Sequence, residues 1–504
     1  MMSELEQVQP KAPPERPSAL KMFTVSPRDR FLAAGTVIWC FLAVDTVLYA
    51  WPWGMGFTAA VWGWYVLLGA VVGRDLFRTW ESRILLVVNL FLGASFALGS
   101  NPYFRGWNFL ALLALVPIHT MSLSAAAHLP WQRPLMLWER LCLLFAGLFC
   151  HMGAVFAALA PRKEKEGEGH IAAAVAGSFA ALGLVAFLLP VLSSADALFA
   201  GSARGLTVFL QLHLAQGAWE LFAAVMITPF LFGLLYSITR PKERKPLAAE
   251  APALDGVLFA IILAALDILY LLFLLVQSAG LFGGPEYLAQ KGISYADWAR
   301  SGFFQMTGVS ALNLTAALAA AVCSRKTGGG WRAVRLLAVV LAGESLVLLA
   351  SAAWRMTLYI SAYGLSFKRC MTYWGMAMTA LFLLAALEKV LRPERSFCRR
   401  AFPLALAGWL VINCIPLDYL TAKNQADRYL SGESPSISAE YLLWELSYDT
   451  LSQLERVDPD LICRYRGGQA YLEKLLSLRR EEAREDCSDW RTWNLSACLA
   501  GAGQ

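Results

Sequence analysis

Twelve apolar stretches, each about as long as a lipid bilayer is thick, follow one another through residues 30–421. A helix needs roughly 20 apolar residues to cross the hydrocarbon core of a membrane. Because hydrocarbon offers no partner to an exposed backbone N–H or C=O group, such stretches fold as helices, whose backbone hydrogen bonds are internal. The expected spans are residues 30–50, 56–73, 84–100, 107–125, 135–160, 171–192, 217–239, 254–281, 302–323, 333–353, 371–391 and 401–421.

The composition agrees with a membrane protein. Of the 504 residues, 58% are hydrophobic and 16% are charged, whereas an ordinary soluble protein has about 25% charged residues. The net charge of +6 comes from bases in short loops between apolar stretches, where they act as topology signals. We therefore infer no nucleic-acid partner, and the expected partners of residues 30–421 are membrane lipids.

Three regions follow from the pattern. Residues 1–29 form a polar tail rich in Glu and Pro, which is typical of disorder rather than of a cleavable signal peptide. Residues 30–421 form the transmembrane domain. Residues 422–504 have 10 Lys/Arg and 14 Asp/Glu, and the helical apolar spacing of residues 438–457 and 469–485 predicts a small helical appendage that packs on the membrane domain. The fold class is therefore all-α: a polytopic transmembrane helical bundle of about 12 spans, with 11–13 allowed, and a small helical C-terminal appendage.

The bases predict an orientation. In the second half of the chain, 15 Lys/Arg fall on one side of the expected spans and 6 on the other, which puts the richer side in the cytoplasm. The first half disagrees, because the loop of residues 74–83 and the N-terminus also have cytoplasmic character. If all twelve stretches crossed the membrane, both ends of the chain would lie on the same side, which contradicts a cytoplasmic N-terminus and an outside C-terminal region. We therefore expect the N-terminus inside, the C-terminal region outside and an odd number of spans, with residues 84–100 or 107–125 not fully crossing.

The ten cysteines show no CxxC pair, and the five histidines are scattered without metal spacing. No metal site and no cofactor is predicted. Cys463, Cys487 and Cys498 lie in the polar C-terminal region, where one disulfide can form if that region faces an oxidising compartment. No P-loop, GxSxG or HExxH motif occurs, so no catalytic residue is assigned, although an intramembrane enzyme needs only two residues from distant helices.

The stretch 254–281 has a polar stripe on an otherwise apolar helix. Tyr270 and Gln277 are seven residues apart and share a face, and Asp267 lies one turn before Tyr270. A charge at mid-membrane costs about 2.5–3.5 kcal/mol on insertion scales. The stripe therefore faces protein or water, either as a ligand pathway or as hydrogen bonds between helices.

Three further charges complete a candidate polar centre. Arg300 follows the loop after residue 281 and is either an ordinary group at the re-entry into the membrane or a binding group for a carboxylate or lipid phosphate. Glu344 and Arg355 are eleven residues apart, three helical turns along one face. Either acid, Asp267 or Glu344, binds a cation, carries a proton or pairs with a base on another helix.

Several ordered segments resemble a family of bacterial multi-pass membrane proteins, domain of unknown function 4173, to which domain of unknown function 4153 is related. FLLVQSAGLFGG and GISYADWARSGFFQ resemble its hallmark, and SADALF, RMTLYISAYGLSFKR, NCIPLDYLTAKNQADRYL, AEYLLWELSYDTL and WRTWNLS follow in order over roughly residues 190–497. The chain departs from the family pattern at Ala197, Gly280, Ser366, Ile415 and Leu417. The matching positions include Ser194, Asp196, Gly283, Gly284, Tyr295, Tyr359, Tyr363 and Asp418.

The resemblance implies a bacterial cytoplasmic-membrane protein and assigns no activity or substrate. The leading functional hypothesis is transport, binding or sensing of a small molecule, an ion or a lipid-linked envelope component through the polar centre. A second is a scaffold or sensor that binds an envelope protein through residues 422–504, and deleting that region would then abolish partner capture but not solute flux. A third is an intramembrane enzyme acting on lipid-linked substrates, which a water-filled groove with a carboxylate and a His would support.

Overall fold

The structure is a computed structural model that describes residues 23–131, 133, 135–159, 215–240, 254–282, 303–457 and 469–502, with four isolated positions at 181, 184, 185 and 292. Helices make up nearly all of it, and in these residues the β pairing is limited to one isolated bridge between Leu254 and Ser324. The all-α prediction is therefore confirmed. Apart from positions 181, 184 and 185, the expected span of residues 171–192 lies outside the described residues.

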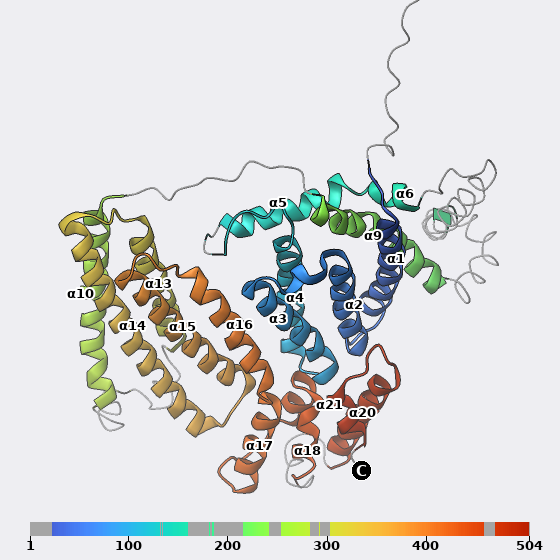
Figure 1. Cartoon of the computed structure of the whole chain (residues 1–504). Helices are drawn as coiled ribbons and strands as arrows, with labels where there is room; N and C mark the ends of the chain where they lie inside the picture. The colour runs from blue at the N-terminus through green and yellow to red at the C-terminus, as the bar shows by residue number, and fades with distance from the viewer. Residues whose placement is uncertain are drawn as a thin grey trace, which may run out of the picture.

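Two groups of helices stand side by side (Figure 1). The first contains α1 (Pro27–Leu48), α2 (Met55–Val72), the short η2 (Gly73–Phe77), α3 (Trp80–Leu98), α4 (Pro102–Ser122), α5 (Leu135–Cys150), α6 (Ala154–Leu159) and α9 (Ala215–Thr239). The second contains α10 (Gly256–Phe282), α13 (Phe303–Cys323), α14 (Gly328–Tyr363) and α15 (Phe367–Leu391). Helix α16 (Cys398–Cys414) joins them, because it contacts α15 on one side and α3 on the other.

Local sequence sets where these helices begin. Ser26 caps α1 in a capping box with Asp29, and Pro27 occupies the first turn, where a missing N–H is harmless. Thr79, Asn101 and Ser366 cap α3, α4 and α15 with side-chain oxygens that accept backbone N–H groups. Each of these four helices therefore starts at a polar residue next to an apolar stretch.

The outer surface of the second group suits lipid. On α10, Leu258, Ile261, Leu269, Leu272 and Leu275 are each more than half exposed. In water so large an apolar surface would drive association, whereas in hydrocarbon it costs nothing to leave it uncovered. The opposite side of α10 packs into a buried cluster with α13 and α14.

Eight described helices are long and apolar enough to cross a membrane, and α16 with α17 (Leu417–Leu430), bent by 47° at their junction, would make a ninth as one broken span. The expected number of about 12 is not confirmed. The expected span 107–125 lies in α4, which buries Arg105, Asn108 and His119 and does not qualify as a span. The expected span 135–160 is interrupted between α5 and α6.

One set of helix ends lies together at the first of two polar faces. Arg28 at the start of α1 donates to the carbonyls of Ala70 and Val71 at the end of α2. Arg240 at the end of α9 pairs with Asp29, with 3.1 Å between the charged atoms. These contacts put the start of α1 and the ends of α2 and α9 together.

The second helix group adds its ends to the same face. Arg335 near the start of α14 donates to the Leu391 carbonyl at the end of α15, and a cavity joins the start of α16 to η2 and the end of α9. The segment before α10 bonds to the end of α13 through Leu254 and Arg325. We call this the basic face, because its loops and helix ends contain Arg28, Arg30, Arg74, Arg78, Arg83, Arg240, Arg325, Lys326, Arg332, Lys389, Arg392, Arg395, Arg399 and Arg400.

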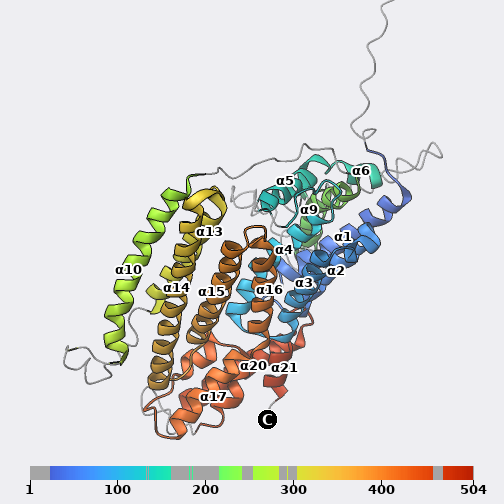
Figure 2. The same ribbon diagram turned by 60° about the vertical axis from the view of Figure 1, so that its left-hand side comes forward.

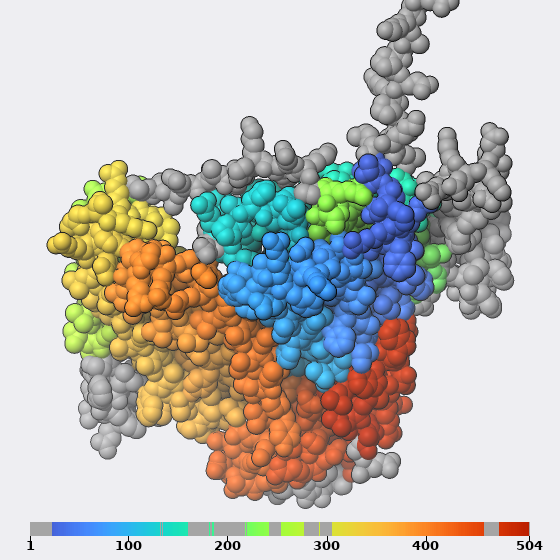
Figure 3. Space-filling model, in the orientation of Figure 1, coloured from blue at the N-terminus to red at the C-terminus, as the bar shows by residue number. Residues whose placement is uncertain are grey.

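The C-terminal region lies at the opposite end, which we call the tail face (Figures 1 and 2). It comprises α17, η3 (Tyr441–Glu445), η4 (Tyr448–Thr450), α18 (Leu451–Leu454), α20 (Gln469–Ser488) and α21 (Leu495–Ala502). Leu442, Leu443 and Leu446 are fully buried and pack with Phe367 and Ile412 of the membrane helices. Figure 3 shows this region against the lower ends of the N-terminal helices. The predicted packing of the appendage on the membrane domain is therefore found, whereas the domain boundary at residue 421 stays a prediction.

The backbone at the start of α2 forms hydrogen bonds with residues 491 and 493 of the C-terminal region. The N–H groups of Met55 and Gly56 donate to the carbonyls of Trp493 and Arg491 at 2.8 and 3.0 Å. A Cβ atom on Gly54 would lie 2.3 Å from the Thr492 carbonyl oxygen. Only glycine therefore allows this close approach of two backbones.

We expect Gly54→Ala to destabilise the protein by about 1–3 kcal/mol, because neither backbone can move away cheaply. Unfolding of the full chain in detergent, followed by heat or denaturant, measures the change. The matched control is Gly106→Ala on α4, where a Cβ meets nothing within 4 Å. Equal stability of the two variants would contradict the proposed close contact.

Candidate functional site

Two acids predicted from the sequence are buried near each other on the packed helices α10 and α14. Asp267 is 7% exposed and Glu344 is 8% exposed, and they are close enough for their charges to interact. Tyr270, one turn beyond Asp267, is also buried and interacts with Glu344. Close packing of α10 against α14 brings these residues together, although they are far apart in the sequence.

Buried polar groups of α13 and α14 lie next to Tyr270 and Glu344, although the sequence pattern did not single them out. The Asn313 amide donates to the Ser345 hydroxyl at 2.9 Å, and Ser345 donates to the Leu341 carbonyl at 2.7 Å. Ser310, Asn313 and Ser345 are completely buried. Asn313 can be recognised in the sequence as an amide in the middle of the apolar stretch 302–323, because such a group needs a hydrogen-bond partner in hydrocarbon.

The pair is short of hydrogen-bond partners. Within the described part of the chain, neither carboxylate oxygen of Asp267 has a partner, and Oε2 of Glu344 and Oδ1 of Asn313 have none either. No ion pair reaches either acid in that part. Two ionised carboxylates cannot share a dry site without a counter-charge. The arrangement therefore suits a shared proton or a bound cation.

The other members of the predicted polar centre do not join the pair in what the structure describes. Arg355 is buried on α14 and follows Glu344 by eleven residues, about 16 Å along the helix axis. Gln277 lies on α10, but its side chain is outside the described residues, as is the whole of Arg300. No group of three or more potential metal-ligating side chains is found in the described ranges.

The family-motif residues separate into two places. Tyr359 and Tyr363 pack together at the tail-face end of α14, with ring centroids 4.9 Å apart, and the Arg369 guanidinium lies 4.3 Å from the Tyr359 centroid. Asp418 lies at the start of α17 and is 4% exposed. Ser194, Asp196, Gly283, Gly284 and Tyr295 lie outside the described residues.

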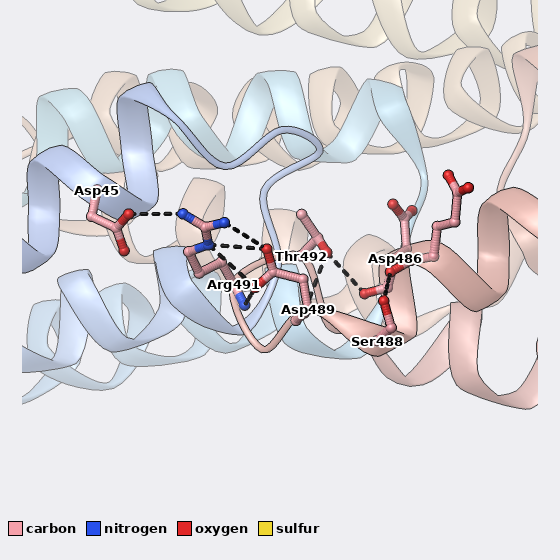
Figure 4. Close-up of polar contacts among 7 residues, drawn as sticks. Asp45, Asp486, Ser488, Asp489, Arg491 and Thr492 are labelled. Carbon is pink, nitrogen blue, oxygen red and sulfur yellow. Dashed lines mark hydrogen bonds and ion pairs between the residues drawn. The ribbon is translucent and has the colours of Figure 1, made fainter. Parts of the chain in front are cut away.

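A second ionic cluster fixes the end of the chain (Figure 4). Arg491 pairs with Asp45 of α1 at 2.8 Å and with Asp489 at 2.8 Å. The Thr492 hydroxyl donates to the Asp486 carbonyl at 2.9 Å. Arg491 holds the pKa of Asp489 below its usual value. No local sequence pattern links this pair, because Arg491 and Asp45 are 446 residues apart.

Histidine 119 has a structural role. Its two ring nitrogens lie 3.1 Å from the Tyr65 hydroxyl and 2.8 Å from the Ser82 hydroxyl. The Asn89 amide donates to the same Tyr65 oxygen at 2.6 Å. Both nitrogens are therefore satisfied, and the cluster joins α2, α3 and α4.

A cavity of about 720 Å³ opens on the basic face. His128 and Asp75 both line it, together with Ser82, Arg140 and Arg399. The hydrogen bonds found for described residues include none between His128 and Asp75. The buried Arg140 is engaged, because it pairs with Glu139 and donates to Ser122 and to the Leu129 carbonyl. The cavity is thus polar and open, but its described residues form no carboxylate–histidine pair.

The ion pair between Arg491 and Asp489 makes the stability of the folded protein depend on pH. A carboxylate whose pKa is lowered on folding stabilises the protein above its ordinary pKa, here 3.8, and the stabilisation is lost as pH falls through the lower folded-state value. We expect Arg491→Gln to cost about 1 kcal/mol at pH 6 and less below pH 3.8. Burial raises the pKa of Asp486. This effect is present in the wild type and in Arg491→Gln, so it does not change the stability difference between them. A stability gap that is constant with pH, measured by denaturant unfolding, would contradict this assignment.

The comparisons with known proteins give a family. The model of the family described as Domain of unknown function (DUF4153) matches residues 86–457, well over half of the chain. The sequence resemblance was stated for domain 4173 with 4153 as its relative, and the match is to that relative. Neither the curated proteins nor the solved structures yield a match. The chain belongs to the DUF4153 family, a domain of unknown function, and has the apolar helices of a multi-pass membrane protein.

Proposed function

We propose that this protein binds a proton or a monovalent cation between α10 and α14, and that transport or sensing depends on that site. The observation that supports the proposal is the buried pair of Asp267 and Glu344, which has no basic partner in the described residues. Each ionised group at such a depth costs about 2.5–3.5 kcal/mol on insertion scales. A protein that retains two acids at this cost gains a site for positive charge.

The neighbouring Asn313 offers a neutral oxygen to such a ligand. Its Oδ1 has no partner in the described part. The Asn313 amide is fixed by Ser345, so its oxygen is held in one orientation. Oxygen ligands of this kind bind hard cations, and the same carboxylates accept a proton when no cation is present.

We expect the melting temperature of the purified full chain in detergent to rise with Na⁺, K⁺ or H⁺ concentration. Asp267→Asn and Glu344→Gln should reduce that rise, because each removes one negative charge from the site. In reconstituted vesicles the same variants should lose any cation or proton flux of the wild type. Asp75→Asn, which changes an exposed acid of the membrane domain, is the control and should behave as the wild type.

A structural role alone gives a different result. If the two acids only hold α10 against α14, the variants will shift the melting temperature by the same amount at every cation concentration and pH. That outcome, with unchanged flux, would exclude the proposed site.

We also propose that the membrane is a bacterial cytoplasmic membrane, with the basic face in the cytoplasm and the tail face outside. The grouping of bases on one face supports this orientation, because Lys and Arg are retained on the cytoplasmic side. A disulfide joins Cys487 of α20 to Cys498 in α21, and disulfides persist in oxidising compartments. An odd number of crossings follows, since the start of α1 and the C-terminal region lie on opposite faces.

We expect protein taken from cells under thiol-blocking conditions to yield the cross-linked Cys487 and Cys498 peptides by mass spectrometry. A membrane-impermeant thiol reagent applied to intact cells or spheroplasts should label Cys414, which is exposed at the tail face, before Cys150. Blocked, unpaired thiols at Cys487 and Cys498, with labelling of Cys150 first, would reverse the orientation.

An envelope partner bound through residues 422–504 stays a prediction. The acidic residues that suggested it are largely engaged inside the region: Glu455 with Arg480, Glu482 with Arg479 and Asp427 with Arg456. Complete deletion also removes Ser447, a hydrogen-bond partner of Asp418. Loss of a partner after that deletion would therefore combine a direct and a structural effect.

A further inference from the structure

A second, smaller cavity of about 200 Å³ lies at the tail face. The end of α3, the start of α4, the junction of α16 with α17 and the η4 turn all contribute to its walls. Its polar lining residues include Asn101, Arg105, Asn108, Asn413, Asp418 and Asp449. Segments far apart in the sequence thus close around one polar space, which we call the tail-face cavity.

Arg105 contributes a buried guanidinium to the lining of this cavity. The residue is 8% exposed, and its Nε donates to the Gly99 carbonyl at 3.2 Å. Its Nη2 is buried and has no hydrogen-bond partner in the described residues. Asp486 interacts with Arg105 electrostatically, but the ion pairs found in the described ranges do not include Arg105. A buried guanidinium nitrogen without an acceptor is costly unless a ligand or water provides one.

Asp418 supplies the opposite charge. Its Oδ2 accepts the Asn101 amide at 2.7 Å and the Ser447 backbone N–H at 2.9 Å. Its Oδ1 is buried and lacks a partner among the residues described. These two bonds hold the carboxylate in place and leave Oδ1 as its unpartnered oxygen.

The neutral amides of the lining are already engaged. Asn108 donates to Ser95 at 2.9 Å and to Asn413 at 2.7 Å, and its oxygen accepts the Trp409 indole N–H at 2.8 Å. Asn413 donates to the Trp409 carbonyl.

The Asp449 carboxylate is engaged as well, because it accepts the Ser496 and Ser447 hydroxyls at 2.6 and 3.2 Å. Within the described lining, the buried atoms without a partner therefore belong to Arg105 and Asp418.

We propose that the tail-face cavity binds a small zwitterion of the α-amino acid class, with its carboxylate at Arg105 and its ammonium group at Asp418. An anion alone would leave Asp418 unsatisfied, and a cation alone would leave Arg105 unsatisfied. A neutral polyol would bond to both but compensate neither charge. The volume of about 200 Å³ is enough for a small amino acid. This proposal is independent of the cation site between α10 and α14.

Cys414 is a built-in reporter, because its exposed thiol belongs to a residue that lines the cavity. We expect glycine, alanine or serine to slow maleimide labelling of Cys414 in the full-length protein in detergent and to raise its melting temperature with dose. Glycinamide, acetate and glycerol at equal concentration should do neither. Labelling of Cys150, an exposed thiol on α5 outside this cavity, should not change.

Charge-neutral variants test the two anchoring residues. Arg105→Gln and Asp418→Asn should each weaken glycine binding about tenfold or more, because each loses a charge-assisted hydrogen bond. Arg428→Gln on α17, which changes an arginine bonded to the Ser361 carbonyl, should leave binding unchanged. The labelling result on the natural chain stands even if a variant misfolds.

Two results would overturn the proposal. If none of the three amino acids changes Cys414 labelling or the melting temperature, the cavity holds water only. If acetate, glycinamide or glycerol acts as strongly as glycine, the effect is that of a general solute and not of a zwitterion site.

Discussion

The lack of hydrogen-bonding partners in hydrocarbon is the constraint on which this structure depends. It requires every backbone group at membrane depth to be satisfied within a helix, and it moves helix ends, loops and charges to the two faces. Ser26, Thr79 and Asn101 satisfy free backbone N–H groups at the starts of their helices. In the whole molecule, the same requirement places helix ends and charged loops at the basic face and the tail face.

The tail face shows how an appendage with a small core becomes part of a membrane protein. Asp418 at the start of α17 accepts bonds from Asn101 before α4 and from Ser447 in the C-terminal region, so one carboxylate fixes three segments. Arg491 ties the end of the chain to Asp45 of α1. Such buried or half-buried polar contacts specify one mutual arrangement, which apolar packing alone would leave loosely defined.

Two buried sites contain charged side chains with atoms that lack a partner in the described residues. Between α10 and α14 these are oxygens of Asp267 and Glu344, and in the tail-face cavity they are Nη2 of Arg105 and Oδ1 of Asp418. By contrast, both ring nitrogens of His119 are satisfied. Because an unsatisfied buried charge is costly, two such groups within one site point to a ligand that supplies the missing partners.

The helical class and most of the apolar spans were readable from the amino-acid order, because the length and hydropathy of a stretch depend on neighbouring residues alone. The expected number of about 12 spans was not confirmed, since 8 or 9 of the described helices qualify. Asp267 and Glu344 were recognised one by one, since an acid in an apolar stretch needs a reason. That they lie near each other on packed helices, and that Arg105 and Asp418 line one cavity, was decided by helix packing. The partner of a side chain on another helix depends on the rotation and crossing of both helices, and no local pattern encodes it.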